Sequence, residues 1–294
     1  MKQGHILQSN QWAEFRLKTP NVKKVLLVGE NRIFIHKIPL LPWAVAYLPR
    51  PENLDNLEEI KEACKKERAI FLKIEPGLGY SDQVSGSRIG SPVLPQHTIY
   101  IDLTQGEEKL LAGMSEKTRY NVRLAQKKNI NIVEGENLEN FIELLEKTED
   151  RQGFYSHPAQ YYRMLWEVLR PEKMVYLLTA VSGQQTAASI ILLRYQDVLY
   201  YAYGGSDPKY REYMAPHLLH WEAIKLGKKL GCKIYDLWGS YKDKPEESDP
   251  WWGIYRFKKG FGGQEVTFPE TFDIPISPLY FLYPFLDKIR KFFK

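Results

Sequence analysis

Apolar residues occur in short clusters along the first eighty residues, separated by glycine, proline and charged residues, a pattern that predicts strands joined by turns. The β-rich stretches 25–28 and 33–38 flank Gly-Glu-Asn and predict a hairpin. A further strand is predicted over 43–48. Apolar residues at helical spacing over 54–64 then predict a helix, and 69–74 predicts a buried strand. We therefore expect three strands, a helix and a fourth strand.

The same order of elements recurs later in the chain. Strands are predicted over 174–181 and 187–194, around a Ser-Gly turn, and over 198–203. A helix is predicted over 219–230 and a last strand over 232–238. Units of three strands, a helix and a strand resemble acetyltransferase folds. We therefore predict an α/β (α+β) fold of two tandem acetyltransferase-like (GNAT-type) domains with mixed, largely antiparallel sheets.

Further helices are predicted between and after these two units. A mostly apolar stripe over 111–125 predicts one helix, and residues 138–149 predict a second. A third apolar stripe, over 282–293, predicts a helix at the end of the chain.

Composition narrows the class of protein. The chain has 294 residues, 44% of them hydrophobic and 26% charged, which suffices for packed cores and excludes a mainly disordered chain. No apolar stretch approaches the roughly 18 residues of a membrane-spanning helix, and the first residues lead into no signal-peptide core. Cys64 and Cys232 cannot make a disulfide framework and are expected to be reduced thiols. We expect a cytoplasmic protein.

Charge is distributed unevenly along the chain. The formal net charge of the whole chain is +5. Residues 109–128 alone hold six basic side chains against one acid, Glu116. Among the six, Arg119, Arg123 and Lys127 are spaced four apart and share one face of the helix predicted there. This face is either an ordinary solvated surface or a binding surface for RNA or precursor phosphates.

Several common catalytic motifs are absent from the sequence. The six histidines are scattered, and the closest pair, His217 and His220, has no neighbouring cysteine, so surface or satisfied histidines are expected rather than a metal site. No P-loop, dinucleotide fingerprint or nucleophile elbow occurs. Residues 207–217, where acetyltransferases carry a glycine-rich pyrophosphate loop, hold two prolines and no glycine. A CoA thioester is therefore disfavoured as acyl donor, and no cofactor is expected.

The segment 251–263 combines aromatic residues with cations. It reads Trp-Trp-Gly-Ile-Tyr-Arg-Phe-Lys-Lys-Gly-Phe-Gly-Gly, and its cations are Arg256, Lys258 and Lys259. Aromatic residues interleaved with cations suit stacking on bases or sugars together with phosphate neutralisation. The alternative is a packed aromatic core edged by a solvated lysine pair.

Six stretches occur in a fixed order over nearly the whole chain. They are Leu7-Gln-Ser-Asn-Gln-Trp, Ile101-Asp-Leu, Lys117-Thr-Arg-Tyr-Asn-Val-Arg-Leu-Ala-Gln-Lys-Lys, Thr148-Glu-Asp-Arg-Gln-Gly-Phe, Tyr235-Asp-Leu-Trp-Gly and Trp252-Gly-Ile-Tyr-Arg-Phe-Lys-Lys-Gly-Phe-Gly-Gly. In this order they resemble the Fem family of peptidoglycan bridge-forming aminoacyltransferases (FemA, FemB and FemX types). No long charged heptad segment is present, so the chain is most similar to the compact FemX type without a coiled-coil arm.

The resemblance implies a domain organisation and a reaction. The first acetyltransferase-like domain is expected over 1–132, with a C-terminal helix over 274–294 packing back on it, and the second, catalytic domain over 133–273. The implied acyl donor is an aminoacyl-tRNA, and the implied acceptor is a UDP-linked or lipid-linked muropeptide precursor. A stem-peptide amine attacks the aminoacyl ester, so that an amino acid enters an interpeptide bridge.

The resemblance also assigns roles to residues. Lys258, held beside Phe257, is implied as the catalytic cation that stabilises the oxyanion, with Lys259 as the rival. The residues expected to bind the precursor are Arg16, Lys18, Arg151, Tyr155, Tyr203, Tyr210 and Arg256, with Arg16 and Lys18 as alternatives for one cation. Those expected to bind tRNA or phosphate are Arg119, Arg123, Lys127 and Lys259.

Two other functions stay open on the sequence alone. One is an acetyltransferase-like enzyme that modifies a surface polysaccharide with another acyl donor, and the other is a non-catalytic module that binds RNA or membrane. We expect a monomer at the cytoplasmic side of the membrane. Its C-terminal helix either packs plainly on the first domain or also makes peripheral contact with an anionic membrane.

Overall fold

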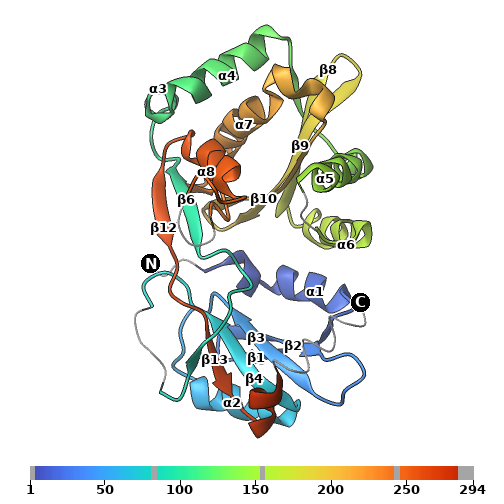
Figure 1. Cartoon of the computed structure of the whole chain (residues 1–294), viewed down its shortest axis with the longest axis vertical. Helices are drawn as coiled ribbons and strands as arrows, with labels where there is room; N and C mark the ends of the chain where they lie inside the picture. The colour runs from blue at the N-terminus through green and yellow to red at the C-terminus, as the bar shows by residue number, and fades with distance from the viewer. Residues whose placement is uncertain (1–3, 81–84, 153–155, 242–245, 284–294) are drawn as a thin grey trace. The chain divides into compact units, whose positions relative to one another are not determined.

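The computed structural model describes residues 4–80, 85–152, 156–241 and 246–283, and it describes the side chains of these residues except those of 150–152. The chain forms two compact units (Figure 1). Unit one holds Met1–Gln96 and Phe268–Lys294, and unit two holds His97–Thr267.

The boundary between the units differs from the one expected between 132 and 133. It falls after Gln96, because strand β6 (His97–Asp102) pairs with strands of unit two. Helix α4 (Glu116–Lys127) likewise packs against helix α7 (Ala215–Lys229) of that unit. The residues between 97 and 132 therefore belong to the second unit.

Unit one contains a six-stranded sheet with the strand order β1-β2-β3-β4-β13-β5. Its elements are η1 (Ile6–Gln8), α1 (Asn10–Lys18), β1 (Val22–Val28), β2 (Asn31–Lys37), β3 (Ala44–Pro49), α2 (Leu57–Lys66), β4 (Ala69–Glu75), β5 (Arg88–Ile89), β13 (Phe272–Pro275) and η3 (Pro278–Leu282). β3 and β4 run parallel, and the other pairs are antiparallel. The predicted hairpin is confirmed, since β1 and β2 pair up to Val28 and Asn31.

Helix α2 covers one face of this sheet. Ile60 and Cys64, one helical turn apart, are buried in one cluster with Ile33 and Ile35 of β2. Residues two apart on a strand point to the same face of a sheet, so the helical and strand periodicities meet in one core.

The end of the chain differs from the single helix predicted there. β13 enters the sheet of unit one between β4 and β5, and η3 follows it. Leu279 and Tyr280 pack against a small cluster of Ile38, Ile70 and Phe71. The chain thus returns to unit one. Most of the apolar stripe predicted for the terminal helix, from residue 284 onward, lies outside the described residues.

Unit two contains a seven-stranded sheet with the strand order β12-β6-β11-β10-β9-β8-β7, in which β10 and β11 are parallel and the other pairs antiparallel. Its other elements are α3 (Glu107–Gly113), β7 (Asn131–Glu134), α5 (Leu138–Gln152), α6 (Ala159–Leu169), β8 (Val175–Ser182), β9 (Gln185–Tyr195), β10 (Val198–Ser206), η2 (Pro208–Tyr213), β11 (Ile234–Asp236), α8 (Trp252–Lys259) and β12 (Gln264–Thr267). α7 covers one face of the sheet and α5 the other (Figure 1).

Close packing of α5 explains one glycine. A Cβ at Gly205 on β10 would lie 2.6 Å from the backbone carbon of Leu144, so only glycine lets this helix approach the strand so closely.

The predicted duplication is confirmed. Both units contain an antiparallel meander, a helix, and a strand parallel to the last meander strand: β1-β2-β3-α2-β4 in unit one and β8-β9-β10-α7-β11 in unit two. The last pair of residues in the parallel ladder is Pro49/Glu75 in the first and Tyr200/Asp236 in the second. These two positions are topologically equivalent.

The helix predicted over 111–125 is two helices, α3 and α4. Met114 and Ser115 separate them, and the Ser115 hydroxyl caps α4 by accepting a hydrogen bond from the Thr118 N–H. The Arg119 guanidinium donates to the carbonyls of Ala112 and Met114 at the end of α3. Serine is a strong N-cap and favours the start of a new helix at this point. The apolar stripe runs on across the break, so periodicity alone does not reveal it. Within the described chain, no helix has the length and apolar character needed to cross a membrane.

Candidate active site

The candidate site lies where the two parallel strands of unit two separate. β10 and β11 pair up to Tyr200 and Asp236, where β11 ends. β10 continues beside β9, across a bulge between Tyr201 and Tyr203. Open α/β sheets bind ligands beyond the carboxyl ends of parallel strands, and bulges redirect side chains. Side chains that gather at this point are therefore candidates for chemistry.

Helix α8 places Lys258 at this point. Lys258 is 7% exposed, and its Nζ donates a hydrogen bond to the Gly239 carbonyl oxygen 2.6 Å away. The same nitrogen lies 5.0 Å from the centre of the Tyr201 ring. A Cβ at Gly204 would collide with the Tyr201 hydroxyl, so glycine there makes room for the phenol.

Burial changes the acid–base chemistry of this lysine. It lowers the pKa of Lys258 to about 7, because a low-polarity surrounding disfavours the ammonium, and the charge of Asp236 offsets part of this effect. Both protonation states are therefore populated near neutral pH. A buried, perturbed lysine at the end of parallel strands is a candidate functional group.

Aromatic rings and a neutral histidine surround Lys258. The His220 Nδ1 lies 2.8 Å from the Tyr235 hydroxyl, and its ring meets the Tyr201 ring edge to face at 4.4 Å. Phe257 packs edge to face on His220 at 5.2 Å. Burial, reinforced by the charge of Lys258, holds the pKa of His220 well below its usual range. His220 is thus a satisfied, neutral core histidine.

The remaining cations of α8 lie on its exposed side. Lys259 is exposed and forms an ion pair with Glu265, and Arg256 is exposed with its guanidinium 5.9 Å from the Trp252 ring centre. Of the two lysines that the sequence left as rivals, Lys258 is the one that lies inside the buried cluster.

The basic face of α4 divides into two kinds of cation. Arg119 is half-buried and bound to the carbonyls that end α3. Arg123 and Lys127 are exposed. Two side chains thus remain at the surface, at the spacing of one helical turn, where a polyanion can reach them.

Tyr203 and Tyr210 lie in other aromatic and polar surroundings. The Tyr203 hydroxyl lies 3.2 Å from that of Tyr161 on α6. Tyr210 lines a polar cavity of about 290 Å³ in unit two, together with the Lys147–Asp207 ion pair, whose atoms are 3.0 Å apart.

The cations expected at the precursor are placed in part. Arg16 lies on α1, and its Nε is buried without a hydrogen-bond partner among the described residues. The Nε2 of His36 is likewise buried without a hydrogen-bond partner among the described residues. Burial and the charge of Arg16 lower the pKa of His36 to about 4. Lys18 ends α1 and is exposed. The side chain of Arg151 and all of Tyr155 lie outside the described residues.

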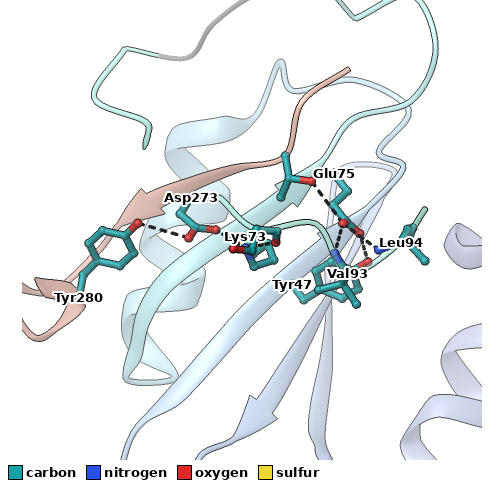
Figure 2. A network of polar contacts seen from close by, with 9 residues as sticks. Tyr47, Lys73, Glu75, Val93, Leu94, Asp273 and Tyr280 are labelled. Carbon is teal, nitrogen blue, oxygen red and sulfur yellow. Dashed lines mark hydrogen bonds and ion pairs between the residues drawn. The ribbon is translucent and has the colours of Figure 1, made fainter. Parts of the chain in front are cut away.

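The equivalent position in unit one is filled by the chain itself. Glu75 is 1% exposed and accepts hydrogen bonds from the Tyr47 hydroxyl, from the Val93 and Leu94 N–H groups at 2.6 and 3.0 Å, and from the Thr271 hydroxyl at 3.3 Å. Figure 2 shows how these groups converge on the carboxylate. Residues 93 and 94 are thereby tied to the end of β4.

Unit one contains further polar contacts of this kind. Lys73 and Asp273 form a nearly buried ion pair at 2.7 Å, and Tyr280 donates to the same aspartate at 3.3 Å (Figure 2). The Arg50 guanidinium lies 3.6 Å above the Phe268 ring. The copy of the site in unit one therefore holds a structural network, whereas unit two holds a buried lysine.

Several residues of the site were not assigned from the sequence. They include Thr98 and Asp236, which hold the turn before Gly239, and His220 and Tyr201, which lie near Lys258. Asp236 stands in Tyr235-Asp-Leu-Trp-Gly, which was noted only as a motif, and Thr98 lies on a different strand. Among the described residues, no three His, Cys, Asp or Glu side chains come together as a metal site requires.

Comparison with known proteins gives a family. The FemAB family model matches residues 77–182 and 177–288. Lipid II:glycine glycyltransferase of Staphylococcus haemolyticus is 22% identical over 94% of this chain and 90% of its own length. The protein of the same name from Staphylococcus aureus (strain USA300) is 20% identical over the same shares.

Solved structures share the fold. A crystal structure of FemX superposes with a TM-score of 0.83 at 20% identity, over 95% of this chain and 94% of FemX. The C-terminal domain of a putative lysylphosphatidylglycerol synthetase from Agrobacterium fabrum superposes with a TM-score of 0.60 at 11% identity, over 86% and 84% of the two chains.

Proposed function

This chain belongs to the FemAB family, and on that premise we propose that it is an aminoacyltransferase. It moves an amino acid from an aminoacyl-tRNA to the stem-peptide amine of a peptidoglycan precursor, and so builds an interpeptide bridge. The observation that carries the proposal is the buried Lys258 at the end of the parallel strands, in a chain whose relatives are named lipid II:glycine glycyltransferases.

The reaction asks for orientation and for a positive charge. The amine nitrogen attacks the ester carbonyl, a C–N bond forms, and the ribose oxygen leaves with the electron pair of the C–O bond and the proton that the amine gives up. Negative charge develops on the carbonyl oxygen in between. A preorganised cation lowers the energy of that state, and Lys258 in its protonated form supplies one. Phe257, the preceding residue, packs on the His220 ring of the same buried cluster.

The absence of a glycine-rich loop supports an ester on tRNA as donor. η2 and the start of α7 contain Pro208 and Pro216, so few backbone N–H groups can gather on a pyrophosphate there. A tRNA instead brings many phosphates, which need exposed cations. We assign this contact to Arg123 and Lys127 on α4 and to Lys259 on α8, with Arg119 holding α4 against α3.

We assign the precursor to the residues expected from the family resemblance. Arg16 has a buried, unpartnered Nε, so an anion bound there would complete its hydrogen bonding. The other residues that we propose to bind the precursor are Lys18, Arg151, Tyr155, Tyr203, Tyr210 and Arg256. Because the relatives are named for lipid II, we infer a lipid-linked acceptor at the cytoplasmic face of the membrane.

A transfer assay tests this function. The purified chain is incubated with a pool of charged tRNAs and with either a lipid-linked or a UDP-linked pentapeptide precursor, and the mass of the precursor is followed. We expect the mass of one amino acid to be added to the lipid-linked form, and none when acetyl-CoA replaces the tRNA pool. Gain on the UDP-linked form alone would correct the acceptor, and no gain with any charged tRNA would contradict the function.

A further inference from the structure

We propose that Asp236 is a positioning residue for the transfer reaction: its carboxylate aims Lys258 and favours its charged form. This inference rests on the proposed function, in which the Lys258 ammonium faces the developing oxyanion. It assigns Asp236 a task that it performs through Lys258.

A tight turn follows β11. Asp236 is 2% exposed, and its Oδ1 accepts a hydrogen bond from the Trp238 N–H, two residues on, at 2.8 Å. This bond holds Trp238 at a φ of 57°, a left-handed conformation that is strained for a bulky residue. The Thr98 hydroxyl lies within hydrogen-bond distance of the Asp236 carboxylate and 2.7 Å from the Trp238 carbonyl oxygen.

A hydrogen bond links this turn to Lys258. The residue after Trp238 is Gly239, whose carbonyl oxygen accepts the hydrogen bond from the Lys258 Nζ at 2.6 Å. The Ser240 N–H donates to the His97 carbonyl at 2.9 Å, so the turn is tied to β6 on this side as well. The direction of the Gly239 carbonyl, and with it the place of the ammonium, therefore depends on the turn that Asp236 holds.

Asp236 also acts on Lys258 through its charge. The titratable groups around Lys258 are Tyr201 of β10, His220 of α7, and Tyr235 and Asp236 of β11. Burial raises the pKa of Tyr201 to about 12 and that of Tyr235 well above its usual range, and it lowers that of His220, so these three are neutral near pH 7. Asp236 thus supplies the negative charge that favours the Lys258 ammonium against the effect of burial.

The test is Asp236→Asn. The amide oxygen can still accept from the Trp238 N–H, so the turn keeps its bond while the charge is lost. Divided by the neutral fraction of the acceptor amine, whose usual pKa lies well above 7, kcat/KM declines as pH rises through the pKa of Lys258, because activity requires the ammonium; this corrected profile has one basic limb. We expect Asp236→Asn to move the basic limb to lower pH by about one unit. Asp102→Asn, which removes an exposed carboxylate from β6, should leave the limb in place.

A second readout needs no turnover. Lysine side chains are labelled with ¹³C, the signal of Lys258 is assigned by its loss in Lys258→Met, and its titration is followed by NMR. A downward shift in Asp236→Asn supports the inference, and an unchanged titration with an unchanged pH limb overturns it. If the wild type transfers no amino acid, the proposed function fails, while the NMR titration still decides whether Asp236 acts on Lys258.

Thr98 gives a second pair of variants in case Asp236→Asn does not fold. Thr98→Ser keeps the hydroxyl that secures the turn, and Thr98→Val removes it with little change in shape. We expect Thr98→Val to lower kcat at least tenfold at unchanged KM, and Thr98→Ser to stay near the wild type. Equal kcat values for the two variants would overturn the positioning role.

Discussion

Lys258 stabilises the oxyanion of the proposed reaction but destabilises the folded state. Burying an ammonium that can give up its proton costs folding free energy, because the unfolded chain keeps the charge in water. The Gly239 carbonyl and the Asp236 carboxylate reduce this cost without removing it, since the pKa of Lys258 still lies at about 7. Such costs are common at functional sites.

The pH dependence of stability tests this view of Lys258. Between pH 7 and the usual pKa of lysine, the unfolded chain holds a proton that the folded chain has lost, so stability rises with pH. The gain from this one group approaches about 1.4 kcal/mol per pH unit within that window. Lys258→Met should therefore be more stable than the wild type near pH 7, and its advantage should shrink toward pH 10.

Urea unfolding at several pH values measures this difference. Lys229→Met, at an exposed position on α7, serves as the control and should show no such trend. A difference between Lys258→Met and the wild type that stays constant from pH 7 to pH 10 would contradict the buried, easily deprotonated lysine.

From the sequence, Lys258 could be assigned as the catalytic cation only with its neighbour Lys259 as a rival. Adjacent residues on a helix point about 100° apart, and the segment 251–263 was recognised by its aromatic and basic residues without a helical register. The structure supplies the register of α8, with Lys258 inside and Lys259 outside. Asp236 could not be assigned because its contact with Thr98 joins residues 138 positions apart.

At the scale of elements, α4 shows what a charge pattern can and cannot indicate. The spacing of Arg119, Arg123 and Lys127 correctly predicted that the three residues lie on one helix. It did not reveal that Arg119 binds the end of α3, which depends on a break at Ser115. The helix thus offers fewer free cations to a ligand than its sequence suggests.

This division predicts different effects along one helix. Arg123→Ala and Lys127→Ala should each weaken tRNA binding and reduce the slope of log affinity against log salt by about one. Arg119→Ala should mainly lower the free energy of unfolding, because two carbonyls lose their donor. Filter binding at several salt concentrations and urea unfolding measure the two effects.

Unit one offers a matched control for the α4 variants. Lys65→Ala removes an exposed cation from α2 and should change neither the affinity for tRNA nor its salt slope. Equal slopes for Arg123→Ala, Lys127→Ala and the wild type would remove α4 from the proposed tRNA surface.

At the scale of the whole molecule, the two units differ in how the chain builds them. The elements of unit two lie in one continuous stretch, His97–Thr267, whereas unit one needs β13 from the end of the chain. The duplication could be predicted because each meander is local in sequence. The place of β13 could not, since a four-residue strand carries little pattern and pairs across about two hundred residues.

Fragments test this difference. Residues 97–267 expressed alone should unfold in one cooperative transition, because they contain every strand of their sheet. A chain that ends at Thr267 should keep hydrogen-exchange protection in β9 and lose part of it in β4, at the amides that pair with β13. Equal protection of β4 with and without residues 268–294 would contradict the assigned strand order.

The most direct test of the account is single-turnover transfer from aminoacyl-tRNA to the lipid-linked precursor by wild type, Lys258→Met and Lys259→Met. Methionine keeps most of the stem of lysine and removes the charge. Because the charge acts on the oxyanion, Lys258→Met should lose about 10²–10³ in kcat at nearly unchanged KM, whereas Lys259→Met should stay within a few-fold. Near-normal kcat in a folded Lys258→Met protein would contradict the central claim.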